Sequence, residues 1–380
     1  MTIRPNILIA PAKYVQGAGA IDEIGEFIVP LGNRVLAVGD AIGLSVTRAG
    51  REQSFGKNNI FQVELEFDGE VSDREIERIA SFSVKNKCGV IMAGGGGKVI
   101  DAVKAAAEDA CAASVIAPTI ASNDAPCSAL SVIYNEDGTF NRLRPLRRNP
   151  DIVLVDTLII AQAPVRYLVA GMGDALATWF EADACHKSGA VNLSGGTATI
   201  TGMAVARLCF DTLMEYGFDA KIACENKMVN SALEKVVEAN TLLSGLGFEN
   251  CGVAAAHALS EGFSLIPEIH GFLHGETVAF GLLVQLLLGG GQDGETNRVF
   301  RFCHEIGLPV TLGDLNADKV DRDMLLSAAE FAAAPGRPSG NMPFEVTGEM
   351  LYDAILAADA MGRDMKAAIP VLNSKISPDR

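Results

Sequence analysis

Short apolar runs recur along the first part of the chain, up to about residue 162. Uninterrupted runs of this length are typical of strands that are buried on both faces of a parallel sheet. They predict strands at Arg34–Gly39, Ile60–Phe67, Gly89–Ala93, Ser114–Ala117, Ala129–Tyr134 and Ile152–Val155. Charged and apolar residues at helical spacing predict helices at Asp73–Lys87, which Ser72 could cap, and from about Val99 to Cys111. The alternation of strand and helix predicts a parallel sheet with helices on its faces.

After about Gln162 the pattern changes to long Ala- and Leu-rich stretches with helical spacing. These predict helices at Val165–Ser188, Gly195–Tyr216, Ala220–Leu246, Leu273–Leu288, Asp321–Ala334 and Thr347–Arg363. The predicted fold is therefore an α/β N-terminal domain, residues 1–162, followed by an all-helical C-terminal domain, residues 163–380. The boundary falls near Ala161–Pro164, where Pro164 suits the start of a helix.

Composition limits the classes of partner. Of the 380 residues 49% are hydrophobic and 21% are charged, so the chain can bury a sizeable core. The formal net charge of −16 disfavours nucleic acid and anionic membranes as partners. The eight cysteines include no Cys-x-x-Cys pair, which favours reduced thiols over a disulfide framework. With no membrane-length apolar run and no signal-peptide pattern, we expect a cytoplasmic location.

Four consecutive glycines, Gly94–Gly97, and Lys98 follow a predicted strand and open a predicted helix. Glycine lets the backbone approach a pyrophosphate closely, and a helix N-terminus offers free N–H groups to it. The stretch lacks both the G-x-G-x-x-G fingerprint and the Walker pattern, so a plain flexible turn is the alternative. The setting between strand and helix favours a phosphate loop.

Asp40 directly follows the predicted strand Arg34–Gly39. A carboxylate there can accept hydrogen bonds from both ribose hydroxyls and repel a 2′-phosphate, which favours NAD over NADP. The same residue could equally cap a helix or turn, and the sequence pattern alone does not choose between the two roles.

Three of the five histidines, His257, His270 and His274, lie between residues 257 and 274. His257 is in an Ala-rich helical run, where a lone histidine is more often a core residue. His270 and His274 are four residues apart, so one helical turn could place both on one face. Asp174 precedes another Ala-rich helical run and could simply cap it. Together these residues suit a catalytic Zn²⁺ or Fe²⁺ site with an open coordination position.

Seven stretches of the chain resemble the glycerol dehydrogenases of the iron-containing (group III) alcohol dehydrogenase superfamily. They are GGGGKVIDAVKAAA, APTIASNDAPCSALSVIY, NPDIVLVDT, GMGDALATWFEA, NTLLSGLGFE, AAAHALSEGF and HGETVAFG, and the similarity covers nearly the whole chain. The resemblance implies a dehydroquinate synthase-like fold, with an NAD-binding α/β domain and a helical metal-binding domain.

The resemblance also implies a role for particular residues. Asp174, His257 and His274 would bind one divalent metal, zinc in the first place and iron as the alternative, and His270 would be a neighbour. The cofactor-binding set would be Asp40, Gly95, Gly96, Gly97, Lys98, Thr119, Ser122, Ser128, Leu130 and Tyr134. Asp124 would contact a polyol substrate together with His257, although its Ser-Asn-Asp-Ala-Pro setting is also typical of a plain turn. Asn123 departs from the threonine expected there. The family further implies a homo-oligomer, often an octamer.

The implied activity is reversible NAD-dependent oxidation of glycerol and related vicinal diols to hydroxyketones such as dihydroxyacetone. One alternative is a dehydrogenase of sn-glycerol 1-phosphate, and another is a non-catalytic NAD-binding protein. A phosphorylated substrate, for that dehydrogenase or for 3-dehydroquinate synthase, calls for basic residues beside the metal. The segments around His257 and His274 contain no Lys or Arg, which disfavours both enzymes.

Overall fold

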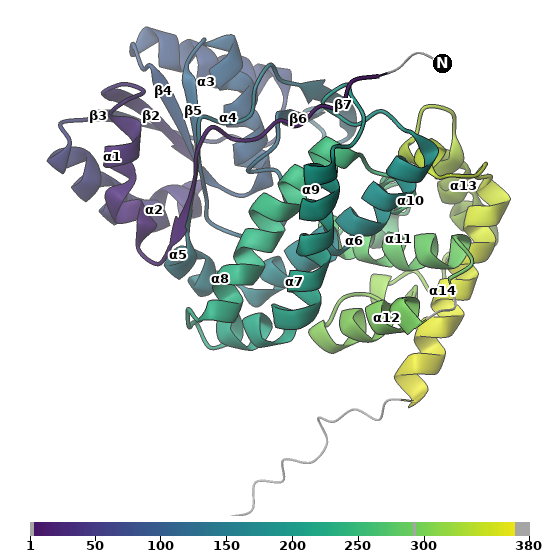
Figure 1. Cartoon of the computed structure of the whole chain (residues 1–380). Helices are drawn as coiled ribbons and strands as arrows, with labels where there is room; N and C mark the ends of the chain where they lie inside the picture. The colour runs from purple at the N-terminus through teal and green to yellow at the C-terminus, as the bar shows by residue number, and fades with distance from the viewer. Residues whose placement is uncertain (1–3, 292–293, 369–380) are drawn as a thin grey trace, which may run out of the picture.

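Six of the strands form one parallel sheet in the first part of the chain (Figure 1). The computed structural model describes residues 4–291 and 294–368. The sheet consists of β1 (Tyr14–Gly17), β2 (Arg34–Gly39), β3 (Phe61–Glu66), β4 (Val90–Gly95), β5 (Ala113–Pro118) and β8 (Ile152–Asp156). Their order is β1-β8-β5-β4-β2-β3, and every neighbouring pair is parallel. The predicted α/β fold with a parallel sheet is confirmed.

Helices cover both faces of the sheet, which is why its central strands are apolar throughout. They are η1 (Ala20–Glu23), α1 (Ile24–Ile28), α2 (Ala41–Lys57), α3 (Asp73–Lys85), α4 (Gly97–Asp109) and α5 (Thr157–Gln162). Successive β2 side chains point to opposite faces: Val35 joins the cluster that holds Ile24 and Phe55, whereas Leu36 joins the cluster that holds Ile79. As predicted, Ser72 caps α3, accepting a hydrogen bond from the Glu75 N–H.

The predicted strand Ala129–Tyr134 is confirmed, but it lies outside the parallel sheet. It is β6 (Leu130–Tyr134), and it pairs antiparallel with β7 (Phe140–Pro145), a strand that the apolar pattern did not indicate. The two strands are joined by a short turn, which is long enough to connect antiparallel strands. β7 is arginine-rich and mostly exposed, so it lacks the apolar run by which the buried strands were recognised.

The second part of the described chain is helical, as predicted. Its helices are α6 (Val165–Ser188), α7 (Ile200–Glu225), α8 (Ser231–Glu238), the π-helical turn η2 (Ala239–Leu243), α9 (Ser244–Cys251), α10 (Ala255–Phe263), η3 (Pro267–Ile269), α11 (His274–Leu288), α12 (Gly294–Ile306), η4 (Gly313–Leu315), α13 (Arg322–Ala333), η5 (Pro338–Asn341) and α14 (Gly348–Ala368). The predicted division at residue 162 falls between α5 and α6.

The helices expected at 195–216 and 220–246 have the wrong boundaries. α7 continues through that gap, because Gly217 is a contact residue and not a helix breaker: a Cβ there would lie 2.6 Å from the Phe302 ring. The chain breaks later, at Lys227, which has the left-handed φ of 57°. Asn230 then caps α8 by accepting a hydrogen bond from the Leu233 N–H.

The segment before β1 connects the sheet part of the chain to the helical part through contacts of its own (Figure 1). Asn6 forms a bridge with Thr197, and the Asn250 side chain makes hydrogen bonds to both the N–H and the carbonyl of Ile9. All eight cysteines are free, in agreement with the prediction of reduced thiols. Among the described residues, no helix combines the length and the apolar character needed to span a bilayer.

Candidate metal centre and cofactor site

Asp174 lies in the middle of α6, and its carboxylate is 1% exposed. The alternative that it caps a helix is therefore wrong, because the helix begins at Val165, nine residues earlier, as its predicted range Val165–Ser188 already indicated. Neither carboxylate oxygen has a hydrogen-bond partner among the described residues. A buried carboxylate without such a partner is costly unless a cation or another donor faces it.

Small residues around Asp174 let three segments meet there. A Cβ on Gly171 would lie 2.0 Å from the Ala121 carbonyl oxygen, and one on Gly173 would lie 2.3 Å from that of Gly275. A Cβ on Gly275 would in turn lie 1.8 Å from the Ala170 carbonyl oxygen. The backbone of α6 thus touches both the loop after β5 and the first turn of α11, so any larger residue would push these segments away from Asp174.

His257, on α10, places its ring between two carboxylates. Its Nε2 is 3.5 Å from Asp174 Oδ1, and its Nδ1 is 2.6 Å from Glu181 Oε2. Glu181 is fully buried on α6, and its other oxygen accepts hydrogen bonds from the Ala254 and His257 backbone N–H groups. Sequence reasoning missed Glu181, although it follows Asp174 by seven residues and therefore lies on the same face of α6.

His274 is the first residue of α11, and its Nε2 is 3.4 Å from Asp174 Oδ1. Its Nδ1 lies 3.4 Å from the Ser260 hydroxyl, and its side chain is 50% exposed. His270 is not on the same helical turn, contrary to the geometry considered from the spacing. It follows the short η3 helix, and its Nε2 lies 2.9 Å from the Ser264 carbonyl oxygen.

One ligand atom each from Asp174, His257 and His274 lies within 4.8 Å of the others. Burial opposes ionisation of Asp174, but the charges of His274 and His257 hold its pKa well below the usual range. Burial also disfavours charge on His257, but Glu181 and Asp174 raise its pKa well above the usual value. One buried carboxylate and two imidazoles fit a divalent ion such as Zn²⁺ or Fe²⁺ and leave coordination positions open.

The glycine loop lies where the sequence placed it, between a strand and a helix. β4 ends at Gly95, Gly96 is the N-cap residue, and α4 begins at Gly97. The start of α2 approaches the same loop, because a Cβ on Gly43 would lie 2.0 Å from the Gly94 carbonyl oxygen. Two helix N-termini therefore lie side by side at the carboxyl edge of the sheet, the usual position of a dinucleotide in an open α/β fold.

The side chains of Asp40 and Lys98 both have partners in the protein. Asp40 caps α2, since its Oδ1 accepts a hydrogen bond of 2.6 Å from the Gly43 N–H. This confirms the capping role, and a ribose contact through the rest of the carboxylate stays a prediction. The Lys98 ammonium is exposed and forms an ion pair with Glu70.

The segment from Thr119 to Tyr134 carries the other predicted contact residues. Asp124 is half-buried, and its Oδ2 accepts a hydrogen bond of 2.7 Å from the Ser244 hydroxyl. Burial and then the charge of Asp174 raise its pKa well above the usual value, so it lies within electrostatic reach of the metal-ligand cluster. Thr119 and Ser128 are buried, Ser122, Leu130 and Tyr134 are half-buried, and burial raises the pKa of Tyr134 to about 12.

A buried lysine on α4 anchors this segment. Lys104 is 3% exposed, and its Nζ lies 3.0 Å from Asp101 Oδ1 and 2.8 Å from the Ala125 carbonyl oxygen. It also donates to the Ser128 carbonyl and hydroxyl and to the Leu130 carbonyl. The ammonium therefore fixes the part of the segment that follows Asp124.

Replacing Lys104 by methionine is expected to lower the free energy of unfolding by about 3–5 kcal/mol, because it leaves Asp101 buried without its cation. Urea denaturation followed by circular dichroism would measure the loss. The matched control is Lys98→Met on the same helix, where the exposed pair with Glu70 is worth about 1 kcal/mol at most. Equal stability of the two variants would show that Lys104 does not anchor the segment.

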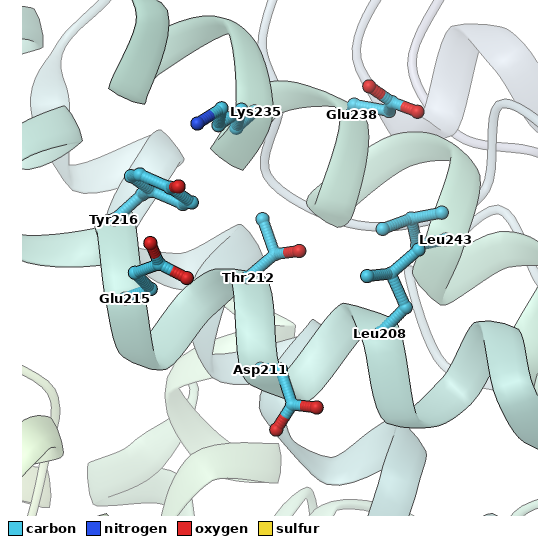
Figure 2. Close-up of a pocket in the computed structure, with 8 residues that line it drawn as sticks. All are labelled: Leu208, Asp211, Thr212, Glu215, Tyr216, Lys235, Glu238 and Leu243. Atoms are coloured by element: carbon cyan, nitrogen blue, oxygen red, sulfur yellow. The ribbon is translucent and has the colours of Figure 1, made fainter.

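A cavity of about 320 Å³ lies elsewhere, between α7 and the α8–η2 region (Figure 2). Its lining includes Asp211, Glu215 and Glu238, with the Lys235 Nζ 3.6 Å from the centroid of the Tyr216 ring. None of the three clustered ligands lines it, so it is separate from the metal-ligand cluster.

Comparison with known proteins identifies related sequences over nearly the whole chain. Residues 11–157 match the family model described as iron-containing alcohol dehydrogenase. The chain is 46% identical to the glycerol dehydrogenase of Pseudomonas putida over 93% of its own length and 97% of that protein. It is 42% identical to the glycolaldehyde reductase of Halobacterium salinarum over 95% of its length and 99% of that protein.

A solved structure shows the same fold. The glycerol dehydrogenase of Schizosaccharomyces pombe superposes with a TM-score of 0.92 at 35% sequence identity, covering 96% of this chain and 93% of that one. Identity of this level over nearly the whole chain, together with the shared fold, establishes the relationship. The chain belongs to the iron-containing alcohol dehydrogenase family, within its glycerol dehydrogenase group.

Proposed function

We propose that this chain catalyses the reversible NAD-dependent oxidation of glycerol and related vicinal diols to hydroxyketones, using one divalent metal ion. Zinc is the first candidate for the ion and iron the second. The observation that carries the proposal is the buried Asp174 carboxylate, which accepts no hydrogen bond from the described residues and faces the Nε2 atoms of His257 and His274. The 46% identity with a glycerol dehydrogenase supports it.

In this proposal the chain positions the reactants. Asp174, His257 and His274 hold the ion, and Glu181 orients the His257 ring through its Nδ1. The N–H groups at the start of α4 bind the cofactor pyrophosphate. When bound, the ion would supply positive charge that lowers the pKa of a substrate hydroxyl, and NAD would supply the acceptor for the hydride of the carbon that bears this hydroxyl. The hydroxyl proton leaves to solvent, so glycerol becomes dihydroxyacetone.

Asp124 gives the proposed preference for vicinal diols. The Ser244 hydroxyl donates a hydrogen bond to one of its oxygens, and the charge of Asp174 contributes to its raised pKa, which supports a position near the cluster. We assign to it a hydrogen bond from the substrate's second hydroxyl. A simple monoalcohol would leave this carboxylate without that partner, at a cost of about 1–3 kcal/mol.

A substrate panel tests the proposal. Purified protein is analysed for metal and then assayed at fixed NAD with glycerol, propane-1,2-diol, propane-1,3-diol and propan-2-ol, and in reverse with dihydroxyacetone and glycolaldehyde. We expect a stoichiometric divalent metal and a preference for the vicinal diols over the other two alcohols. NAD binding without metal or turnover would instead indicate a non-catalytic nucleotide-binding protein.

A phosphorylated substrate is the less favoured alternative. The arginines that contact α10 and the α11 region, Arg337 and Arg166, are paired with Glu261 and Glu276. A substrate phosphate would have to displace one of these carboxylates. Including glycerol 1-phosphate in the panel tests this alternative, since a lower KM for it than for glycerol would reverse the assignment.

We further infer that the protein is cytoplasmic and forms a homo-oligomer of up to eight copies. Light scattering would measure the mass of the assembly.

Replacing Asp40 by serine is expected to reduce the preference for NAD over NADP roughly tenfold, because the Asp40 carboxylate would no longer repel the 2′-phosphate of NADP. Two such charges near a protein surface interact by about 1–4 kcal/mol at 4 Å. Serine is chosen because it can still cap α2, whereas alanine would lose the hydrogen bond to Gly43 as well. The ratio of kcat/KM values for the two cofactors measures the effect. An unchanged ratio in the serine variant would show that Asp40 is a cap and nothing more.

A further inference from the structure

The loop after β5 lies directly against the glycine loop. A Cβ on Gly96 would lie 2.8 Å from Cδ1 of Ile120, and a Cβ on Gly97 would lie 2.7 Å from Nδ2 of Asn123. Two successive glycines of the cofactor loop therefore face two residues of the segment that ends in Asp124. This contact brings Asn123, a half-buried residue, next to the first N–H groups of α4.

A hydrogen bond fixes which end of the Asn123 amide faces the glycine loop. Its Oδ1 accepts a hydrogen bond of 3.3 Å from the Ala125 N–H, two residues further along the chain. The amino group, Nδ2, is consequently the end that faces Gly97. Nδ2 donates a hydrogen bond to none of the described residues. The amide is thus oriented by the loop and has a donor left over beside the helix N-terminus.

We propose that the Asn123 amide donates a hydrogen bond to the pyrophosphate of the dinucleotide bound at the start of α4. The inference rests on the proposed function, because it assumes that NAD binds at this loop. It makes Asn123 a cofactor-binding residue and not only a neighbour of the substrate carboxylate Asp124.

The charge distribution explains why a side-chain amide suits this place. The chain has a formal net charge of −16, which opposes an anionic ligand. The cation in the first turn of α4, Lys98, is already paired with Glu70. An uncharged N–H donor held by its own loop adds a contact to phosphate without needing to break an ion pair.

Binding measurements on Asn123 variants test the proposal. Asn123→Ala removes the donor, and Asn123→Asp removes it but keeps an acceptor for the Ala125 N–H. Asn226→Asp is the control, since it adds the same charge at an exposed position after α7. Isothermal titration calorimetry would give dissociation constants for NAD, for ADP as a pyrophosphate probe, and for adenosine as a probe without phosphate. Metal content is measured in parallel.

We expect Asn123→Ala to weaken both NAD and ADP about tenfold, as for one lost hydrogen bond to a charged acceptor. Asn123→Asp should weaken them further, because its charge lies beside the phosphates. Adenosine affinity, metal content and the Asn226→Asp control should stay at the wild-type level. Wild-type affinity for ADP in both Asn123 variants would overturn the inference, as would an equal loss of adenosine affinity. Failure of the wild-type protein itself to bind NAD would instead overturn the proposed function.

Discussion

His274→Ala protein is expected to be purified without its metal ion and to lose at least about a thousandfold in kcat/KM, because metal-ion charge stabilisation is worth several kcal/mol. His274 is one of the three side chains that form the cluster among the described residues, and its Nε2 lies 3.4 Å from Asp174 Oδ1. Its half-exposed position at the start of α11 makes a folding defect from the substitution small. NAD binding should persist, because the glycine loop belongs to the sheet half of the chain.

Metal analysis, a calorimetric NAD titration and a glycerol assay measure the three parts of this expectation. The matched control is His270→Ala, which removes the same side chain four residues earlier. His270 contacts the Ser264 carbonyl oxygen and lies outside the cluster, so this variant should keep its metal and turnover. Full turnover in metal-free His274→Ala protein would contradict the ligand assignment.

The buried strands were predictable because a short apolar run bounded by turn residues is typical of a strand that is covered on both faces. β2 matches its predicted range and β4 extends two residues beyond it, because glycines at the end of a strand give no apolar signal. Helix α2 was not indicated, since three glycines interrupt its pattern. Two of those glycines are contact residues: Cβ atoms on Gly43 and Gly50 would lie 2.0 Å from Gly94 and 2.4 Å from Asp22. A tertiary contact of this kind cannot be distinguished from a turn in a single sequence.

The site was only partly predictable, for a related reason. Local spacing suggested that His270 and His274 share a helical turn, whereas the structure joins His274 to His257 on a different helix. Asp174 could be interpreted as a cap because it precedes an Ala-rich helical run. The glycines before it, Gly171 and Gly173, allow α6 to touch the loop at Ala121 and the α11 turn at Gly275. Family resemblance selected His274, which spacing alone could not do.

Glu181→Gln protein is expected to bind its metal about 10–100-fold more weakly, as is usual when the partner of a ligating histidine is lost. Glu181 holds two backbone N–H groups with one oxygen and the His257 Nδ1 with the other. Because a carboxylate only accepts hydrogen bonds, Nδ1 must carry the ring proton. In the neutral ring, which is the form that binds a metal ion, the lone pair of Nε2 is then free, and it faces Asp174 Oδ1 at 3.5 Å.

Glutamine has almost the same shape but only one accepting oxygen. If that oxygen takes the two backbone N–H groups, the amino group must face Nδ1 and donate to it. The ring proton then moves to Nε2, which can no longer bind a cation until the ring or the amide rearranges.

Competition with a chelating dye would measure the metal dissociation constant, and thermal unfolding of the metal-free protein would show whether the fold has changed. Asp183→Asn is the matched control, since it neutralises a carboxylate on the same helix that pairs with Lys187 at the surface. A wild-type dissociation constant in the Glu181→Gln variant would mean that burial of the ring, and not Glu181, sets the tautomer of His257.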